Sequence, residues 1–182
     1  MSDRPDAGFS LPVRERLASA DLRVFRFLQA WRDARAGGSI PRRRAFDPMA
    51  APDLLPWIWL YAWEPDRDDF RCRLAGEQIN AAWGRSIRGL TLRDVVGATD
   101  HSTIRARWRR VMDELLVHYG ARNERLSALE TRRAERLLAP LADDAGAPGY
   151  ILGLSLYAIE AADPTRPALK PDDSVQFPCD EI

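Results

Sequence analysis

The order of the periodic segments is the feature that most limits what this chain can fold into. An amphipathic helical segment comes first, two strand-like segments follow, and a helical stretch separates these from three further strand-like segments. The strand-like segments lie at about 54–63, 70–75, 117–127, 133–142 and 150–158. This order predicts an α+β fold built on a five-stranded antiparallel sheet, with helices on one face and an amphipathic N-terminal helix that covers the other.

The predicted N-terminal helix, residues 17–36, carries an apolar stripe. Its apolar residues recur at spacings of three and four, which places them on one face of the helix: Leu17, Ala20, Val24, Phe27, Trp31 and Ala34. Gly37 and Gly38 end the pattern. The exposed part of the stripe is expected to form an interaction surface, with Leu17, Val24, Phe27 and Trp31 as its candidate residues.

The second strand-like segment has two different faces. Phe70, Cys72 and Leu74 alternate with Arg71 and Arg73, so one face is apolar and the other carries guanidinium groups. The preceding strand must match this polarity, and two registers are open. In the first, Ile58, Leu60 and Ala62 share the apolar face, and the arginines lie within cation–π reach of Trp59, Tyr61 and Trp63. The second register reverses these two faces.

Proline and charge mark both ends of the chain. The head is rich in arginine, and the stretch from residue 160 onward carries six acidic residues against Arg166 and Lys170. We expect a mobile N-terminus over 1–15, one folded domain over 16–160 that includes the helix 17–36, and a flexible, acidic, proline-rich tail over 161–182.

Composition excludes several classes of protein. The 27 basic and 27 acidic residues balance, so no global field would attract nucleic acid or an anionic membrane. No apolar run approaches the roughly 18 residues that span a bilayer, and no secretory signal is present, which predicts a cytoplasmic protein. Cys72 and Cys179 fit neither a disulfide framework nor a zinc cluster, so we expect reduced thiols and no metal site.

Several short motifs, taken in this order, resemble the PAS domain. They cover roughly residues 24–158 and are Trp31 with Arg35 and Gly37, Ile40-Pro41-Arg42, Phe46-Asp47-Pro48, Leu54-Leu55-Pro56, the segment 70–76 and the segment 135–141. Within 79–89, Asn80 followed by Gly84 and Gly89 also matches the general PAS pattern. The resemblance is strongest to a group of short bacterial single-domain PAS proteins formerly catalogued as a domain of unknown function.

Membership of that family would imply a sensory domain whose sheet and helices enclose a small-molecule pocket. No kinase, cyclase or DNA-binding segment follows within the chain, so a signal is expected to leave by contact with a signalling partner or a second copy, as in a homodimer. We therefore predict a stand-alone sensory domain that binds a small apolar or amphipathic ligand. The candidate pocket residues are Ile58, Leu60, Phe70, Cys72, Leu74, Trp83, Leu152 and Leu154.

The two common PAS cofactors are both disfavoured by the residues present, and the cofactor is left unknown. A haem would need an axial histidine on the long helix, whereas His101 and His118 flank the predicted helix 101–116. In flavin-binding light sensors of the family a reactive cysteine precedes an Arg-Phe-Leu-Gln run. In this chain the Arg-Phe-Leu-Gln run at 26–29 follows Phe25 and not a cysteine. Cys72 lies in a strand, so no reactive thiol is in the required place.

Two other functions stay open. The first is a ligand-free adaptor or dimerisation module whose interior is filled by side chains. The second, more remote, is an enzyme on a similar α+β scaffold that uses an acid–base pair such as Glu77 with His101 or His118. Four arginines surround Trp108 in the long helix, but its spacing from Ile104 and Val111 predicts a buried tryptophan rather than a nucleic-acid site.

Overall fold

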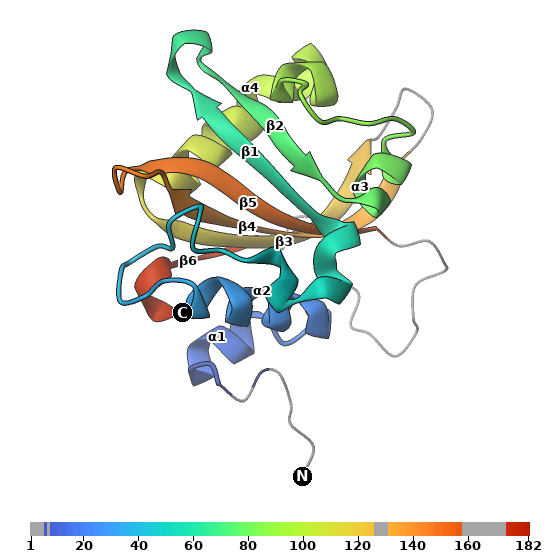
Figure 1. The fold of residues 1–182 in the computed structure, drawn as a ribbon. Helices are drawn as coiled ribbons and strands as arrows, with labels where there is room; N and C mark the ends of the chain where they lie inside the picture. Colours follow the sequence, from blue (N-terminus) through green and yellow to red (C-terminus); the bar gives the residue numbers. More distant parts are fainter. Residues whose placement is uncertain (1–5, 7, 126–130, 158–173) are drawn as a thin grey trace.

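One antiparallel sheet of six strands organises the computed structural model, which describes residues 6, 8–125, 131–157 and 174–182 (Figure 1). The strands follow the spatial order β2-β1-β5-β4-β3-β6. Their bounds are β1 Ile58–Glu64, β2 Asp69–Ala75, β3 Leu116–Arg125, β4 Thr131–Ala142, β5 Pro148–Tyr157 and β6 Ser174–Pro178. The predicted α+β class and antiparallel sheet are confirmed, with β6 as one strand more than expected.

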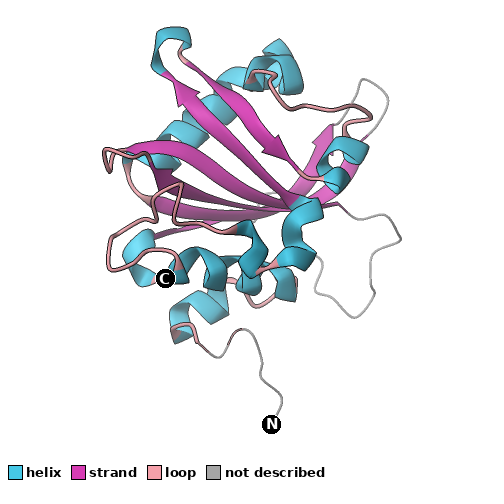
Figure 2. Ribbon diagram, in the orientation of Figure 1, coloured by secondary structure: helices cyan, strands magenta, loops and turns pink. Residues whose placement is uncertain are grey.

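Helices cover both faces of this sheet (Figure 2). On one face lie α1 (Leu11–Arg16) and α2 (Leu22–Asp33), and on the other lie α3 (Glu77–Ala82) and α4 (Leu92–Asp113). Within the described residues there are also four short 3₁₀ turns, namely η1 Pro48–Ala50, η2 Pro52–Trp57, η3 Pro65–Arg67 and η4 Cys179–Glu181. The sheet therefore separates two apolar cores, which we call the α2-side core and the α4-side core.

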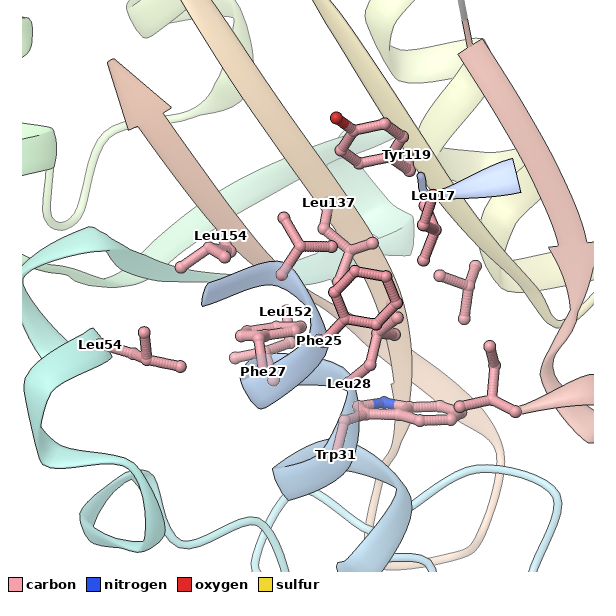
Figure 3. Close-up of a cluster of buried hydrophobic side chains, with 14 of the residues drawn as sticks. Leu17, Phe25, Phe27, Leu28, Trp31, Leu54, Tyr119, Leu137, Leu152 and Leu154 are labelled. Carbon is pink, nitrogen blue, oxygen red and sulfur yellow. The ribbon is translucent and has the colours of Figure 1, made fainter. Parts of the chain in front are cut away.

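The residues of the predicted apolar stripe are buried in the α2-side core, although Leu17 lies at the end of α1 and not in α2. Leu17, Val24, Phe27 and Trp31 are each at most 1% exposed. Figure 3 shows the side chains of α2 directed at Leu137, Leu152 and Leu154 of the sheet. The prediction that this stripe forms an exposed interaction surface is therefore wrong, because the same periodicity that suggests a docking face serves packing within the chain.

A buried carboxylate fixes the beginning of α2. Asp21 caps the helix by accepting a hydrogen bond from the backbone N–H of Arg23 at 2.9 Å. The backbone N–H of Asp21 in turn donates to Glu135 Oε2 at 2.9 Å, and the Tyr119 hydroxyl donates to the same oxygen at 3.3 Å. Strands β3 and β4 thus hold the helix in place through one side chain of the sheet.

Both ends of the chain are more structured than predicted where the structure describes them. Residues 11–16 form α1, with Val13 fully buried, and residues 174–182 form β6 and η4. Strand β6 pairs with β3 and buries Phe177. The guanidinium of Arg35 donates to the carbonyl of Cys179 at 2.8 Å, so the basic head contacts the acidic end. The described residues do not include 1–5, 7 and 161–173 of the two predicted end segments.

A β-bulge sets the register of the first hairpin. Leu60 pairs with Leu74, whereas Tyr61 pairs with Cys72, so the alternation of β2 reverses at Arg73. Trp59 and Tyr61 consequently share the α4-side core with Phe70 and Cys72, while Leu60 and Leu74 pack on the α2 side. The register that places the three aromatic residues beside Arg71 and Arg73 is therefore wrong, and the reversed register is the one observed for Trp59 and Tyr61.

Candidate functional site

A small cavity lies in the α4-side core between the sheet and the helices. Its volume is about 20 Å³, which is room for about one water molecule. The floor comes from the sheet and the roof from α3, α4 and the segment between them. The lining residues are Trp59, Tyr61, Arg136 and Tyr157 on the floor, and Ile79, Trp83, Ile87, Leu92, Val95, Val96 and Trp108 on the roof.

Aromatic rings form the rigid wall of this cavity. Trp108 of α4 stacks on Trp59, with ring centroids 4.9 Å apart and an interplanar angle of 17°. Tyr61 meets the same Trp108 edge-on at 4.9 Å, and Phe70 does so at 5.2 Å. Each such pair of rings stabilises the folded state by about 0.5–1.5 kcal/mol beyond the contribution of its buried apolar area. The predicted burial of Trp108 is confirmed, while Arg105 and Arg109 of α4 pair with Asp68 and Asp113 at the surface.

A polar cluster crosses the cavity floor. The indole N–H of Trp59 donates to Ser155 Oγ at 2.8 Å, and Nε of Arg136 donates to the same oxygen at 3.0 Å. The guanidinium of Arg136 lies 5.6 Å from the Trp59 ring centroid and reaches the Tyr157 hydroxyl at 3.5 Å. Ser155 is fully buried and therefore orients both Trp59 and Arg136.

Gly153 explains why Trp59 can lie flat over the sheet. The two residues are cross-strand partners in β1 and β5. A Cβ atom at position 153 would lie 2.1 Å from Cζ2 of the Trp59 ring, closer than two carbons can approach. The absence of a side chain at this position is therefore a requirement for the cavity floor.

The roof contains a short helical turn, residues 92–96, which Thr91 caps and Gly97 ends. Helix α4 is broken at Gly97, which has φ 79°, and Gly89 before the helix has φ 84°. Both values lie in the left-handed region that favours glycine. The turn between them supplies Leu92, Val95 and Val96 to the roof, and it is separated from Trp108 by the break at Gly97. The break at Gly97 thus makes this turn a segment distinct from the part of α4 that carries Trp108.

The structure does not bring the predicted pocket residues together. Of these candidates, Trp83 lines the cavity, and Phe70 and Cys72 lie in the same core without lining it. The remaining candidates lie across the sheet in the α2-side core: Ile58, Leu60, Leu74, Leu152 and Leu154. The reversed register of β1 would have predicted Trp59 and Tyr61 as cavity residues. No pattern in the sequence predicts that Arg136 is also one of them.

The histidines make contacts other than the predicted acid–base pairs. His101 Nε2 lies 3.0 Å from Asp69 Oδ1, and this pair joins the beginning of β2 to α4. His118 Nδ1 lies 3.1 Å from Nε2 of Gln176, which ties β3 to β6. Glu77 is exposed at the beginning of α3. The separation of Asp69 and His101 along the chain leaves no local signal that could have predicted their contact.

We expect both thiols to be unreactive in the folded protein. Burial raises the pKa of the Cys72 thiol from its ordinary value of 9.0 to about 11, and burial raises the pKa of Cys179 to about 12. For Cys72 this lowers the thiolate fraction near pH 8 about 100-fold. A colourless disulfide reagent that releases a chromophore should react with neither thiol until denaturant is added. Rapid labelling of the native protein would contradict this expectation.

The same raised pKa values predict loss of stability at alkaline pH. The thiols of the unfolded chain ionise near pH 9, whereas those of the folded protein stay protonated until about pH 11 and 12. The stabilisation is therefore complete below pH 9 and is lost as the pH rises through the folded-state values. Urea unfolding at a series of pH values should show this decline, and it should be smaller in Cys72→Ala than in the parent protein.

Among the residues that the structure describes, no helix combines the length and the apolar character needed to cross a membrane.

The chain is similar in fold to several solved structures. The light-oxygen-voltage protein of Rhodobacter sphaeroides is 17% identical, with a TM-score of 0.45 over 58% of this chain and 61% of that chain, which is less than two thirds of its length. The PAS domain of BvgS from Bordetella pertussis is 17% identical, with a TM-score of 0.47 over 59% of this chain and 80% of that chain. No curated protein matches the chain.

Light-oxygen-voltage domains recur among these folds, and one of them was studied with a flavin analogue. That domain is 15% identical, with a TM-score of 0.47 over 62% of this chain and 84% of that chain. The expectation that flavin is disfavoured thus finds no support in these comparisons, while the expectation about haem stays a prediction. The family model described as "PAS domain" matches residues 20–156, which is most of the sequence. The chain therefore belongs to the PAS domain family.

Proposed function

We propose that this PAS domain is a sensor that binds a small apolar or amphipathic molecule between the sheet and the helices α3 and α4. PAS domains are in general sensory or interaction modules rather than catalysts. In this proposal the chain is not an enzyme, and a signalling partner or a second copy reads the bound state through direct contact. The proposal includes a cytoplasmic location and excludes nucleic acid and membranes as partners.

The mixed lining of the cavity carries this proposal. Small-molecule sites in proteins combine apolar and aromatic walls with a few convergent polar groups. Here the aromatic wall of Trp59, Tyr61 and Trp108 meets the polar pair Arg136 and Tyr157 at one floor. The α2-side core, by contrast, is sealed by apolar side chains at the centre of the sheet. The α4 side is thus the favoured place for a ligand.

Ligand entry requires the roof to move. Drug-sized ligands occupy pockets of roughly 300–1,000 Å³, whereas the described cavity has a volume of about 20 Å³. In this proposal it is the closed form of the site. The turn 92–96 is the segment whose displacement would enlarge the cavity, because it lines the roof and α4 is broken at Gly97 directly after it. The same displacement would change the surface of the domain and provide a physical route from binding to partner contact.

The ligand-free adaptor is the second candidate, and the small cavity volume favours it. In that function Trp59 and Trp108 fill the interior permanently, and the domain acts only through its surface. The two functions predict different masses for the protein as it is purified from cells.

Native mass spectrometry of the freshly purified protein tests the proposal directly. We expect an additional mass that is lost on denaturation, and an absorption spectrum would show whether the ligand is a visible chromophore such as flavin or haem. An apo mass, with no ligand recovered after saturation with cell extract metabolites, would contradict the sensor. An apo homodimer would support the adaptor in its place.

A matched pair of variants locates the ligand. Val96→Trp places an indole in the roof of the cavity, whereas Val175→Trp places one on β6, away from the cavity. Both valines are half-buried, so the larger tryptophan side chain should disturb the surrounding packing to a similar extent at the two positions. Val96→Trp should reduce ligand occupancy at least tenfold, and Val175→Trp should leave it unchanged. Equal effects of the two variants would place the ligand elsewhere.

A further inference from the structure

We infer that the carboxylate of Asp69 is a latch that keeps the roof of the cavity closed. This inference rests on the proposed function and names how ligand entry to the same site is controlled. Asp69 begins β2 and is only 7% exposed. Its side chain contacts α4 on both sides of the break at Gly97, and these two contacts define the latch.

Two partners hold one oxygen of this carboxylate. Oδ1 accepts a hydrogen bond from the backbone N–H of Phe70 at 2.7 Å and lies 3.0 Å from Nε2 of His101. His101 belongs to the part of α4 that follows Gly97, and its side chain is largely buried. The orientation of the carboxylate is therefore fixed by the β1–β2 hairpin and by the body of the helix.

The other oxygen holds the turn 92–96. The backbone N–H of Arg93 donates to Oδ2 of Asp69 at 3.4 Å. This N–H lies in the first turn of a helix, where it has no acceptor within the helix and where the partial positive charge attracts a carboxylate. Its distance is above the usual range of about 2.7–3.2 Å, so a small displacement of the turn releases the contact.

Other polar contacts hold the turn only weakly. Apart from the cap at Thr91, two hydrogen bonds between described residues join the turn to parts of the molecule outside α4. The first is the contact with Asp69, and in the second the guanidinium of Arg85 donates to the carbonyl of Asp94 at 2.8 Å. That second bond is exposed, so water competes for both of its groups. The apolar side chains of the turn pack in the α4-side core, but hydrophobic contact has no preferred direction. Asp69 therefore provides the more buried polar contact that fixes the position of the turn.

The segment before the turn is anchored independently of Asp69. The backbone N–H of Cys72 donates to the carbonyl of Leu90 at 2.9 Å, and the N–H of Gly89 donates to the carbonyl of Cys72 at 2.9 Å. Loss of the latch would leave these bonds in place and release the part of the chain between them and the break at Gly97. That part lines the roof, so its displacement is the one that opens the cavity.

The latch acts on ligand binding through the population of the closed form. In the proposed function the turn is displaced when the ligand is bound, so the contact between Arg93 and Asp69 exists only in the closed form. An interaction confined to the closed form lowers the apparent affinity, because the form that binds is populated less. A weaker latch should therefore raise the affinity by about two- to tenfold, the equivalent of one hydrogen bond. Damage to the fold would lower the affinity instead.

Asp69→Asn weakens the latch with almost no change of size. Its amide has one acceptor oxygen, which should stay at the Oδ1 position because Phe70 and His101 both contact it there. The amino group then faces the N–H of Arg93, and two donors cannot pair. Hydrogen exchange of the full chain, followed by mass spectrometry, should be about two- to tenfold faster at 92–97 and unchanged in α2. Unchanged exchange at 92–97, or an equal increase throughout the chain, would overturn the latch.

A small apolar fluorescent probe, N-phenyl-1-naphthylamine, tests the effect on the cavity. Fluorescence titration should give about two- to tenfold tighter binding to Asp69→Asn than to the parent protein. The added change Val96→Trp should abolish this gain, because it fills the roof of the cavity. Equal or weaker binding by a variant whose turn exchanges faster would show that Asp69 does not control ligand entry.

Control variants separate the latch from general loss of stability. Asp113→Asn removes a carboxylate that pairs with Arg109 on the surface of α4, and it should change neither measurement. If Asp69→Asn does not fold, His101 tests the same arrangement. His101→Ala lets the carboxylate turn away and should speed exchange at 92–97, whereas His101→Gln retains an N–H donor and should restore the behaviour of the parent protein. Equal behaviour of the two histidine variants would contradict the latch.

Failure of the latch and failure of the proposed function are distinguishable. Hydrogen exchange needs no ligand, so it tests the contact of Asp69 with the turn whether or not the cavity is occupied. Unchanged exchange in Asp69→Asn, together with a ligand recovered from the purified protein, would overturn the latch and leave the sensor standing. Absence of probe binding by both the parent protein and Asp69→Asn, together with an apo mass in native mass spectrometry, would overturn the sensor and with it the control of ligand entry.

Discussion

Replacement of Trp31 by alanine should lower the free energy of unfolding by about 3–5 kcal/mol, the range measured for large aromatic side chains removed from protein cores. Trp31 is fully buried between α2 and the sheet. Its indole N–H donates to the carbonyl of Pro140 at 3.0 Å, so the change would also leave a buried acceptor without its partner. Urea unfolding followed by circular dichroism measures the loss.

An exposed residue on the same helix provides the control. Arg26 forms a surface ion pair with Asp53, and exposed pairs of this kind contribute about 0–1 kcal/mol. Arg26→Ala should therefore leave most of the stability intact, and Trp31→Phe should lose less than Trp31→Ala because much of the apolar contact remains. A stable Trp31→Ala protein with a changed mass in solution would restore the stripe as an interface between molecules and contradict its burial.

The second large effect is expected for Gly153→Ala, a change of one methyl group. The new Cβ would lie 2.1 Å from Cζ2 and 2.2 Å from Cε2 of Trp59. The ring cannot easily retreat, because Trp108 stacks on it at 4.9 Å. Overpacking of this kind costs about 1–3 kcal/mol. The variant should also lose affinity for ligands of the cavity, since displacement of Trp59 breaks its hydrogen bond with Ser155.

Gly149→Ala is the matched control for this clash. Gly149 lies in the same strand, and a Cβ there would meet its nearest neighbour, Cβ of Asp143, at the ordinary contact distance of 3.4 Å. We expect a change within about 0.5 kcal/mol in urea unfolding. In a Trp59→Ala background, Gly153→Ala should cost little, because the atoms that it strikes are gone. An equal cost in both backgrounds would show that Trp59 is not the cause.

The pattern of residues in the sequence was sufficient to predict the α+β fold class and the burial of Trp108. The strand 70–75 was predicted close to its observed bounds, because the strand period is a local property of the chain. The predicted helix 17–36 is wrong at its beginning, since α2 starts at Leu22 after a turn that follows α1. The predicted strand 54–63 begins only at Ile58, because Pro52–Trp57 forms a 3₁₀ turn. The resemblance to PAS domains rested on short motifs in the correct order, and the family match over residues 20–156 confirms it. The sixth strand escaped prediction because prolines and acidic residues in 161–182 are typical of a tail.

The candidate site was less predictable, since it depends on contacts between distant parts of the chain. A bulge at Arg73 decides which face of the sheet receives Phe70 and Cys72, and therefore on which side the aromatic wall forms. The pocket residues predicted from strand alternation consequently fell on both faces. Arg136 stands in a strand between buried residues, and its relation to Ser155 and Trp59 arises only when β1, β4 and β5 pair.

By itself, the sequence determined the order of the elements, the α+β class and the apolar stripe of α2, because each of these follows from the spacing of neighbouring residues. Only the tertiary structure decided that the stripe is buried, that the C-terminal strand β6 joins the sheet, and that Arg136 lies on the floor of an aromatic cavity. The physical reason is that strand register and side-chain burial depend on the free energy of contacts between segments far apart in the chain, which local periodicity does not contain.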